Sequence, residues 1–200
     1  MVEINYACEG QVDSAIAERL IRHVGGKVGI ARPAGGKSKL DPLVPKYLNA
    51  AQYQRMKWLV LRDLDRDGQC APELRKMILE GSDPGFCFRI AVRETESWLL
   101  ADSRSMAAFL RVSESKIPQA PDDIDDPKEK LVSLARGSRR SDIRIALVPH
   151  PKSGLSSGPE YASWMTKFAS QHWNLADAVA SQRSPSLIKA VGRIRELTKL

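Results

Sequence analysis

The sequence is poor in cysteine, histidine and aromatic residues, and these shortages exclude several classes of protein. Its 200 residues include three cysteines, Cys8, Cys70 and Cys87, which lie far apart and form no CxxC pair. An odd number of isolated cysteines argues against a disulfide framework and against a structural zinc site. The three histidines are equally scattered, so they predict no histidine metal site. Reduced thiols in a cytoplasmic protein are the simplest interpretation.

Long hydrophobic runs are also absent. The apolar runs are far shorter than the roughly 20 residues of a membrane-spanning helix. The first ten residues, MVEINYACEG, lack a basic start followed by an apolar core, so we expect no signal peptide. Apolar residues make up 42% of the chain and charged residues 28%, which is typical of a globular domain. We therefore expect a cytoplasmic protein without a membrane partner.

Basic residues outnumber acidic ones, 31 against 24, which leaves a formal net charge of +7. A basic excess suits a polyanionic partner such as DNA or RNA. An ordinary solvated surface would have the same composition, so the charge alone does not decide. The excess gains meaning because the chain also carries a tight cluster of acids.

That cluster ends the stretch WLVLRDLDRDG at 58–68. Four apolar residues, Trp58 to Leu61, predict a buried strand, and Asp63, Asp65 and Asp67 follow at its carboxyl end. In open α/β sheets, ligands bind just outside the carboxyl ends of the strands. Carboxylates crowded there repel one another unless a cation lies between them. Oxygen ligands of this kind suit Mg²⁺ or Mn²⁺.

The alternation of strand and helix patterns predicts an α/β fold with a mostly parallel central sheet flanked by helices. Strands are expected at 2–8, 28–31, 58–61 and 85–92, with a short last strand at 146–148. Helices are expected at 13–24, 43–54, 72–80, 93–110, 128–136, 161–173 and 185–200. We expect residues 1–115 to form the core and residues 116–200 to form a linker and a helical C-terminal extension packed on it, within one compact domain.

Two segments that invite a ligand interpretation are expected to be loops. The stretch ARPAGGKSKL at 31–40 has alanine where a phosphate-binding P-loop needs its first glycine, so we reject ATP binding by this chain. We interpret Gly35 to Lys39 as a flexible basic loop, in which Lys37 and Lys39 are solvated unless they contact phosphate. The acidic, proline-rich stretch at 118–130 is expected to be a solvated loop.

Acidic residues also follow two other predicted strands. Glu9 and Gly10 follow the first strand, and Glu94 and Glu96 follow the strand at 85–92. Three acidic strand ends can meet in one pocket if their strands are neighbours. The alternative is that Glu9 and Glu96 lie on surface turns, and that the aspartates at 63–67 only cap the next helix.

The motifs CEGQVD at 8–13 and VLRDLDRDG at 60–68 resemble the Toprim domain, which is shared by topoisomerases, primases and OLD-type nucleases. That family carries Glu-Gly after its first strand and DxD at a later strand end. The motif AVRETESWLLAD at 91–102 is similar to a small bacterial branch of Toprim-like proteins, in which a glutamate precedes a W-L-L helix. That glutamate corresponds to Glu96. The C-terminal SPSLIKAVGRIREL is similar to the same branch.

The resemblance implies a Toprim-like fold and metal-dependent hydrolysis of phosphodiester bonds in nucleic acid. It implies that Glu9, Asp63, Asp65 and Glu96 hold Mg²⁺ or Mn²⁺. The DxD pair can be read as Asp63 and Asp65 or as Asp65 and Asp67. We prefer the first reading, because Asp63 directly follows the apolar strand, and the second stays open.

The resemblance also implies partners. Toprim-like relatives are often encoded beside an ABC- or AAA-type ATPase, and several such pairs act in antiphage defence. OLD-type nucleases use a lysine near the metals, and Lys152 is the candidate for it here. Asp13 would support a metal ligand or bind the metal weakly. A non-catalytic regulatory or nucleic-acid-binding subunit of such a complex is the alternative.

Overall fold

The computed structural model, which describes residues 1–199, contains a four-stranded, all-parallel sheet. The strands are β1 (Glu3–Cys8), β2 (Lys27–Pro33), β3 (Trp58–Asp63) and β4 (Phe86–Ala91), in the order β2-β1-β3-β4. The predicted α/β architecture with a parallel central sheet is therefore confirmed. Because all four strands run the same way, their carboxyl ends lie at one edge of the sheet.

Strand β3 lies between β1 and β4, and its sequence explains this position. Its apolar residues from Trp58 to Leu61 are buried on both faces of the sheet, as is usual for strands of a parallel sheet. Ala7 of β1 pairs with Val60, and Asp63 pairs with Ala91 of β4. Strands β2 and β4 form the two edges of the sheet.

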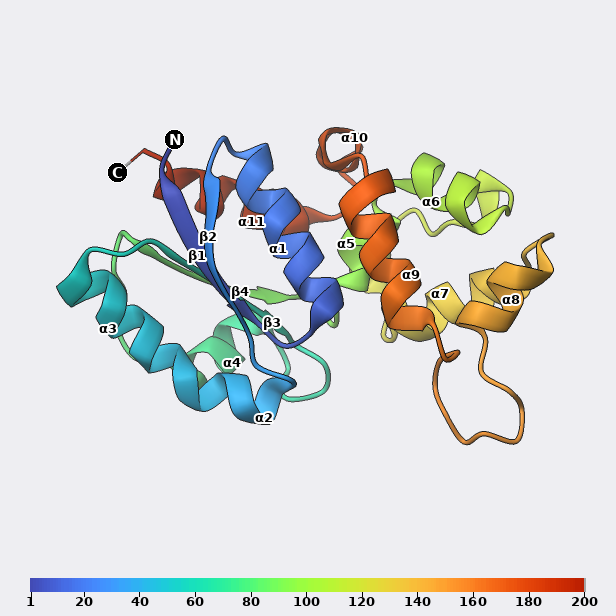
Figure 1. Ribbon diagram of the computed structural model, residues 1–200, viewed down its shortest axis with the longest axis horizontal. Coiled ribbons are helices and arrows are strands. Elements are labelled where there is room, and N and C mark those ends of the chain that lie inside the picture. The colour runs from blue at the N-terminus through green and yellow to red at the C-terminus, as the bar shows by residue number, and fades with distance from the viewer. Residues whose placement is uncertain (200) are drawn as a thin grey trace.

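Helices cover both faces of the sheet (Figure 1). Helices α1 (Gln11–His23) and α11 (Pro185–Leu197) contribute to the larger apolar core on one face. Helices α2 (Lys37–Leu40), α3 (Val44–Gln54) and α4 (Ala71–Ile78) contribute to a separate core on the other face. None of the helices within residues 1–199 combines the length and the apolar character that crossing a membrane requires.

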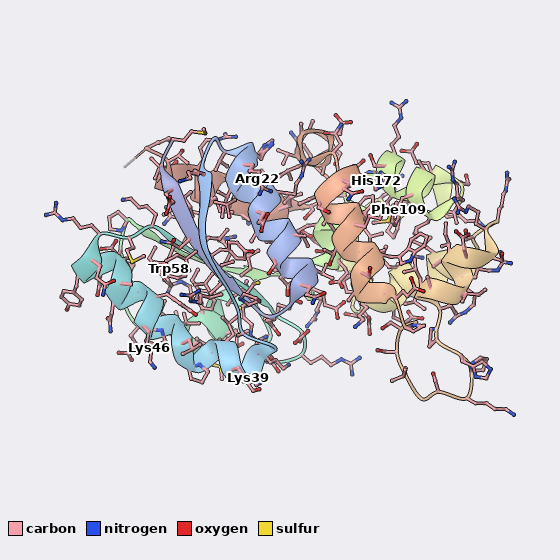
Figure 2. The ribbon with its side chains drawn as sticks, viewed as in Figure 1. Arg22, Lys39, Lys46, Trp58, Phe109 and His172 are labelled. Carbon is pink, nitrogen blue, oxygen red and sulfur yellow. The ribbon has the colours of Figure 1, made fainter. Side chains whose placement is uncertain are left out.

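The remaining helices gather on one side of the sheet, at the right of Figure 1. They are α5 (Glu96–Leu100), α6 (Ser103–Leu110), α7 (Pro127–Arg136), α8 (Ser141–Leu147), α9 (Tyr161–Lys167) and α10 (Leu175–Ala180). Trp98 and Trp173 are fully buried among them. Phe109 of α6 packs against His172 with ring centroids 5.1 Å apart (Figure 2). The extension predicted at the C-terminus is indeed helical.

Three local predictions are wrong. Residues 146–148 form no strand, because Ala146 and Leu147 end helix α8, whose buried side chains recur at helical spacing. The basic loop at Gly35 to Lys39 is not irregular throughout, because Lys37 begins the one-turn helix α2. The single helix expected at 93–110 is broken at Asp102, whose side chain accepts the backbone N–H of Ser105 and caps α6.

Candidate functional site

The acidic residues that follow β1, β3 and β4 meet at the carboxyl edge of the sheet. The Oε1 atom of Glu9 accepts a hydrogen bond from the backbone N–H of Asp63 at 3.1 Å. The Oδ1 atom of Asp63 accepts one from the backbone N–H of Thr95, beyond β4, at 2.9 Å. One chain of hydrogen bonds thus joins three strand ends that lie far apart in the sequence.

Asp13 belongs to the same cluster through α1. Its Oδ2 atom accepts the backbone N–H of Gly10 at 2.9 Å, which closes the first turn of the helix. Its Oδ1 atom accepts the hydroxyl of Thr95 at 2.7 Å. Thr95 is buried and therefore serves two carboxylates, donating its backbone N–H to Asp63 and its side-chain hydroxyl to Asp13.

Burial makes these carboxylates reluctant to ionise. Burial raises the pKa of Asp63 well above its usual range, and the neighbouring charges of Asp13, Glu96 and Glu9 raise it further. Burial also raises the pKa of Glu9 to about 7, although the Asp63 N–H and the Arg62 guanidinium act in the opposite direction. The pKa of Asp13 is raised mainly by burial as well. The edge therefore gathers several carboxyl groups in a place where their ionised forms are poorly solvated.

Glu96 begins helix α5 and is buried. Its Oε1 atom accepts a hydrogen bond from the hydroxyl of Tyr161 at 3.2 Å. Burial raises the pKa of Glu96 to about 8, and the charges of Glu94 and Asp13 add to the effect. The ammonium of Lys128 lies over the Tyr161 ring, 5.2 Å from its centroid. Helices α7 and α9 thus supply residues to the acidic edge.

Two cations approach the same edge from the side of β3. The side chain of Arg62 is only 2% exposed and lies 3.0 Å from Asp41, 2.6 Å from Asp67 and 3.6 Å from Glu9. The ammonium of Lys37 lies 2.9 Å from Asp65 and 2.7 Å from Asp67. The alternative of a solvated Lys37 is therefore wrong in this structure, because α2 places its ammonium against two aspartates.

The three aspartates after β3 lie in different surroundings. Asp63 lies in the buried cluster, whereas the Lys37 ammonium and the Arg62 guanidinium hold the pKa of Asp67 below its usual value. Asp65 lies between Asp63 and Asp67 in the chain and has a positive φ of 48°. Its backbone N–H donates to the carbonyl of Arg93. The capping alternative is wrong, because the N-terminal residue that flanks α4 is Cys70 and no side chain caps that helix.

Lys152 lies in the exposed segment between α8 and α9, which extends away from the sheet (Figure 1). Its backbone N–H bonds to the Nδ1 atom of His150 at 3.3 Å. Within residues 1–199 it forms no ion pair with the acidic edge, and its role near a metal stays a prediction.

The carboxylates have the chemistry, but not the present geometry, of a divalent-cation site. Asp13, Asp63 and Glu96 receive their hydrogen bonds from uncharged donors of Gly10, Thr95 and Tyr161, so these contacts would not compensate the negative charge of the ionised carboxylates. Such buried oxygen ligands suit Mg²⁺ or Mn²⁺. As the side chains stand, no group of three or more His, Cys, Asp or Glu residues among the described residues could hold a metal ion. The donor set fits a cation, and ligation would require side-chain rotation.

Sequence reasoning missed four residues of this site. Thr95 lies inside the motif at 91–102, but the motif assigned it no role. Tyr161 lies outside any motif, and only the tertiary structure brings this residue of α9 to Glu96. Arg62 carried a signal, since an arginine inside an apolar strand must find acidic partners when it is buried. Lys37 carried a weaker one, as a lysine after two glycines in a basic segment.

No protein-family model matches this chain, and no curated protein matches it. Two solved structures are similar over nearly its whole length. One is the C-terminal region of the OLD protein of Xanthomonas campestris pv. campestris, with 15% identity, a TM-score of 0.39, and coverage of 97% of this chain and 92% of that one. The other is the C-terminal region of the Burkholderia pseudomallei OLD protein, with 16% identity, a TM-score of 0.40 and 96% coverage of both chains. A likeness at this level carries no argument about function, which must be argued from this chain's own residues.

Proposed function

We propose that this chain is a divalent-cation-dependent nuclease that hydrolyses phosphodiester bonds in DNA or RNA. The observation that carries the proposal is the gathering of buried, mutually repelling carboxylates from three parallel strand ends. Glu9, Asp63, Asp65 and Glu96 would hold Mg²⁺ or Mn²⁺. The chemistry that either ion supplies in such a site is activation of water and stabilisation of charge on the phosphate.

The protein's own residues have separable roles in this proposal. Thr95 fixes the orientation of Asp63 through its backbone N–H, and Tyr161 fixes Glu96 through its hydroxyl. Arg62 is buried and holds the acidic turn in place. Lys37 has a side chain that is 41% exposed, so it can exchange an aspartate for a substrate phosphate. This exchange would place a positive charge where the reaction develops negative charge.

The surface next to Lys37 suits a polyanion. Lys39 of α2 and Lys46 of α3 are exposed on the outer side of these helices (Figure 2). Arg32, at the end of the edge strand β2, is exposed as well. The net charge of +7 supports the same assignment. The Toprim resemblance adds an ABC- or AAA-type ATPase as the proposed partner and antiphage defence as the proposed setting.

One observation favours a second candidate function, a nucleic-acid-binding or regulatory subunit without catalysis. The Lys37 ammonium already bridges Asp65 and Asp67, as a bound cation would. A chain in which lysine permanently replaces the metal would keep the fold and the basic surface, but it would not hydrolyse its ligand.

The deciding experiment is a pair of assays on the purified chain, on Asp63→Asn and on a control, Glu80→Gln. Glu80 follows the end of α4 and is exposed. The first assay is Mn²⁺ binding by calorimetry. The second is cleavage of plasmid DNA and of total tRNA in Mg²⁺, Mn²⁺ or EDTA. The nuclease proposal expects metal binding and metal-dependent cleavage in the wild type and in Glu80→Gln, with both lost in Asp63→Asn.

The two candidate functions differ in their outcomes. Salt-sensitive nucleic-acid binding that EDTA leaves unchanged, together with no Mn²⁺ binding, would establish the non-catalytic subunit. If the chain binds Mn²⁺ but does not cleave, the same cleavage assay is repeated after mixing the chain with the proposed ATPase partner. Continued absence of cleavage in that mixture would refute the nuclease.

A further inference from the structure

A cavity of about 760 Å³ lies beside the outer edge of β4. Residues of β4 line it, together with the first turn of α4, the segment at 122–125 and the N-terminal turn of α11. Within residues 1–199 no strand pairs with this edge of β4. The volume lies within the range of roughly 300–1,000 Å³ that is usual for small-molecule sites.

The floor of the cavity is apolar. Leu64, Phe88 and Ile90 line it and are themselves almost fully buried. Ala71 and Pro72 of α4 line it as well. A surface of this kind suits a flat organic group better than a hydrated ion, because apolar contact area is stabilised by removal from water.

Cationic side chains converge on the same cavity from three elements. Arg75 comes from α4, Arg89 from β4 and Lys189 from α11. The Nε–H group of Arg89 is buried and has no hydrogen-bond partner among the described residues. Burial lowers the pKa of this guanidinium, and the nearby charges of Arg193 and Arg75 lower it further. A buried donor without an acceptor is costly, so an anionic ligand would relieve it.

The acidic residues around the cavity leave this guanidinium group free. Asp122 accepts hydrogen bonds from the Ser184 hydroxyl at 2.7 Å and the Ser186 backbone N–H at 2.8 Å. Asp125 is almost fully exposed and lies 3.9 Å from Arg93. Asp123, in the same short segment, is exposed. No hydrogen bond or ion pair within residues 1–199 joins any of these aspartates to Arg89.

We propose that this cavity binds a nucleoside monophosphate, with the phosphate on Arg89 and either Arg75 or Lys189, and the base against Phe88 and Ile90. Arginine forks match phosphate geometry and bind it with paired, charge-assisted hydrogen bonds. The base of the ligand then contacts the apolar floor of the cavity, and its phosphate contacts the cationic side chains. The cavity adjoins the acidic edge at Leu64 and Arg93, but none of the carboxylates assigned to the metal lines it. Its occupancy therefore requires neither the metal nor the nuclease activity.

Calorimetry on the whole chain in EDTA tests the proposal. The probes are the four ribonucleoside 5′-monophosphates, the matching neutral nucleosides and inorganic phosphate. We expect at least one monophosphate to bind, and its nucleoside and inorganic phosphate each to bind at least about tenfold more weakly. Absence of binding by all four monophosphates at millimolar concentration would overturn the proposal. If inorganic phosphate bound as tightly as the monophosphates, the cavity would be an anion site without a base pocket, and the proposal would also be overturned.

Variants locate the binding. Arg89→Met keeps an unbranched stem but removes the guanidinium, and should weaken the monophosphate at least about tenfold. Its melting temperature should not fall, because an unpaired buried donor is removed. Arg104→Met, on the exposed surface of α6, is the control and should bind like the wild type. Ala71→Trp fills the cavity without changing its charge and should also abolish binding. Unchanged affinity in a folded Arg89→Met or Ala71→Trp protein would contradict the assignment.

Discussion

Replacing Glu9 by glutamine should stabilise the metal-free protein at pH 8 while removing its response to metal. The Glu9 side chain is only 16% exposed, and burial raises its pKa from 4.5 to about 7. One pKa unit corresponds to about 1.4 kcal/mol, so keeping Glu9 ionised in the folded state costs about 3 kcal/mol. Glutamine keeps an oxygen that can accept the Asp63 N–H but carries no charge.

The pH dependence of this effect has a definite sign. The pKa of Glu9 is higher in the folded than in the unfolded chain, so the folded state binds more protons between pH 4.5 and 7. Stability from the protonated carboxyl is complete below pH 4.5 and is lost as the pH rises through 7. The difference in unfolding free energy between Glu9→Gln and wild type should therefore be small at pH 4 and reach about 3 kcal/mol above pH 7.

Urea unfolding in EDTA from pH 4 to pH 8 measures the pH dependence of stability. The same experiment with Mg²⁺ at pH 8 measures the response to metal. Glu80→Gln is the control, because Glu80 is exposed and should change stability by less than about 0.5 kcal/mol. Mg²⁺ should stabilise the wild type and not Glu9→Gln. A Glu9→Gln protein that is less stable than the wild type at pH 8, or equally stabilised by Mg²⁺, would refute the reasoning.

Two further predictions concern other charged and ionisable groups. Arg62→Met should destabilise the protein by about 3–5 kcal/mol, because it leaves the partner carboxylates of a buried guanidinium unpaired. Lys37→Met should cost about 1 kcal/mol or less, because the Lys37 side chain is 41% exposed. Equal losses of stability in urea unfolding would contradict this argument from burial. At pH 8 a thiol reagent should modify the exposed Cys70 quickly and leave Cys8 and Cys87 intact in the folded protein. The reason is that burial raises the pKa values of Cys8 and Cys87 to about 12 and 11. Two rapidly modified cysteines in mass spectrometry would show that one of the buried thiols is accessible.

The prediction of the fold succeeded where the pattern of apolar residues is local. The run from Trp58 to Leu61 can be buried only as an inner strand, and the alternation of such runs with amphipathic helices requires parallel connections. The prediction failed at 146–148, because a short apolar run has the same composition in a strand and at the end of a helix. It also failed at Asp102, where a capping side chain splits one helical pattern into two helices.

The sequence by itself determined that acids follow three strands, because residue type and strand ends are both readable from the chain. The tertiary structure decided which acids share one environment. Strand order placed Glu9, Asp63 and Thr95 within hydrogen-bonding distance, and helix packing brought Tyr161 to Glu96. The tertiary structure also placed the Lys37 ammonium against Asp65 and Asp67. These contacts join residues far apart in the chain, and they depend on the register and packing of whole elements, which no local pattern specifies.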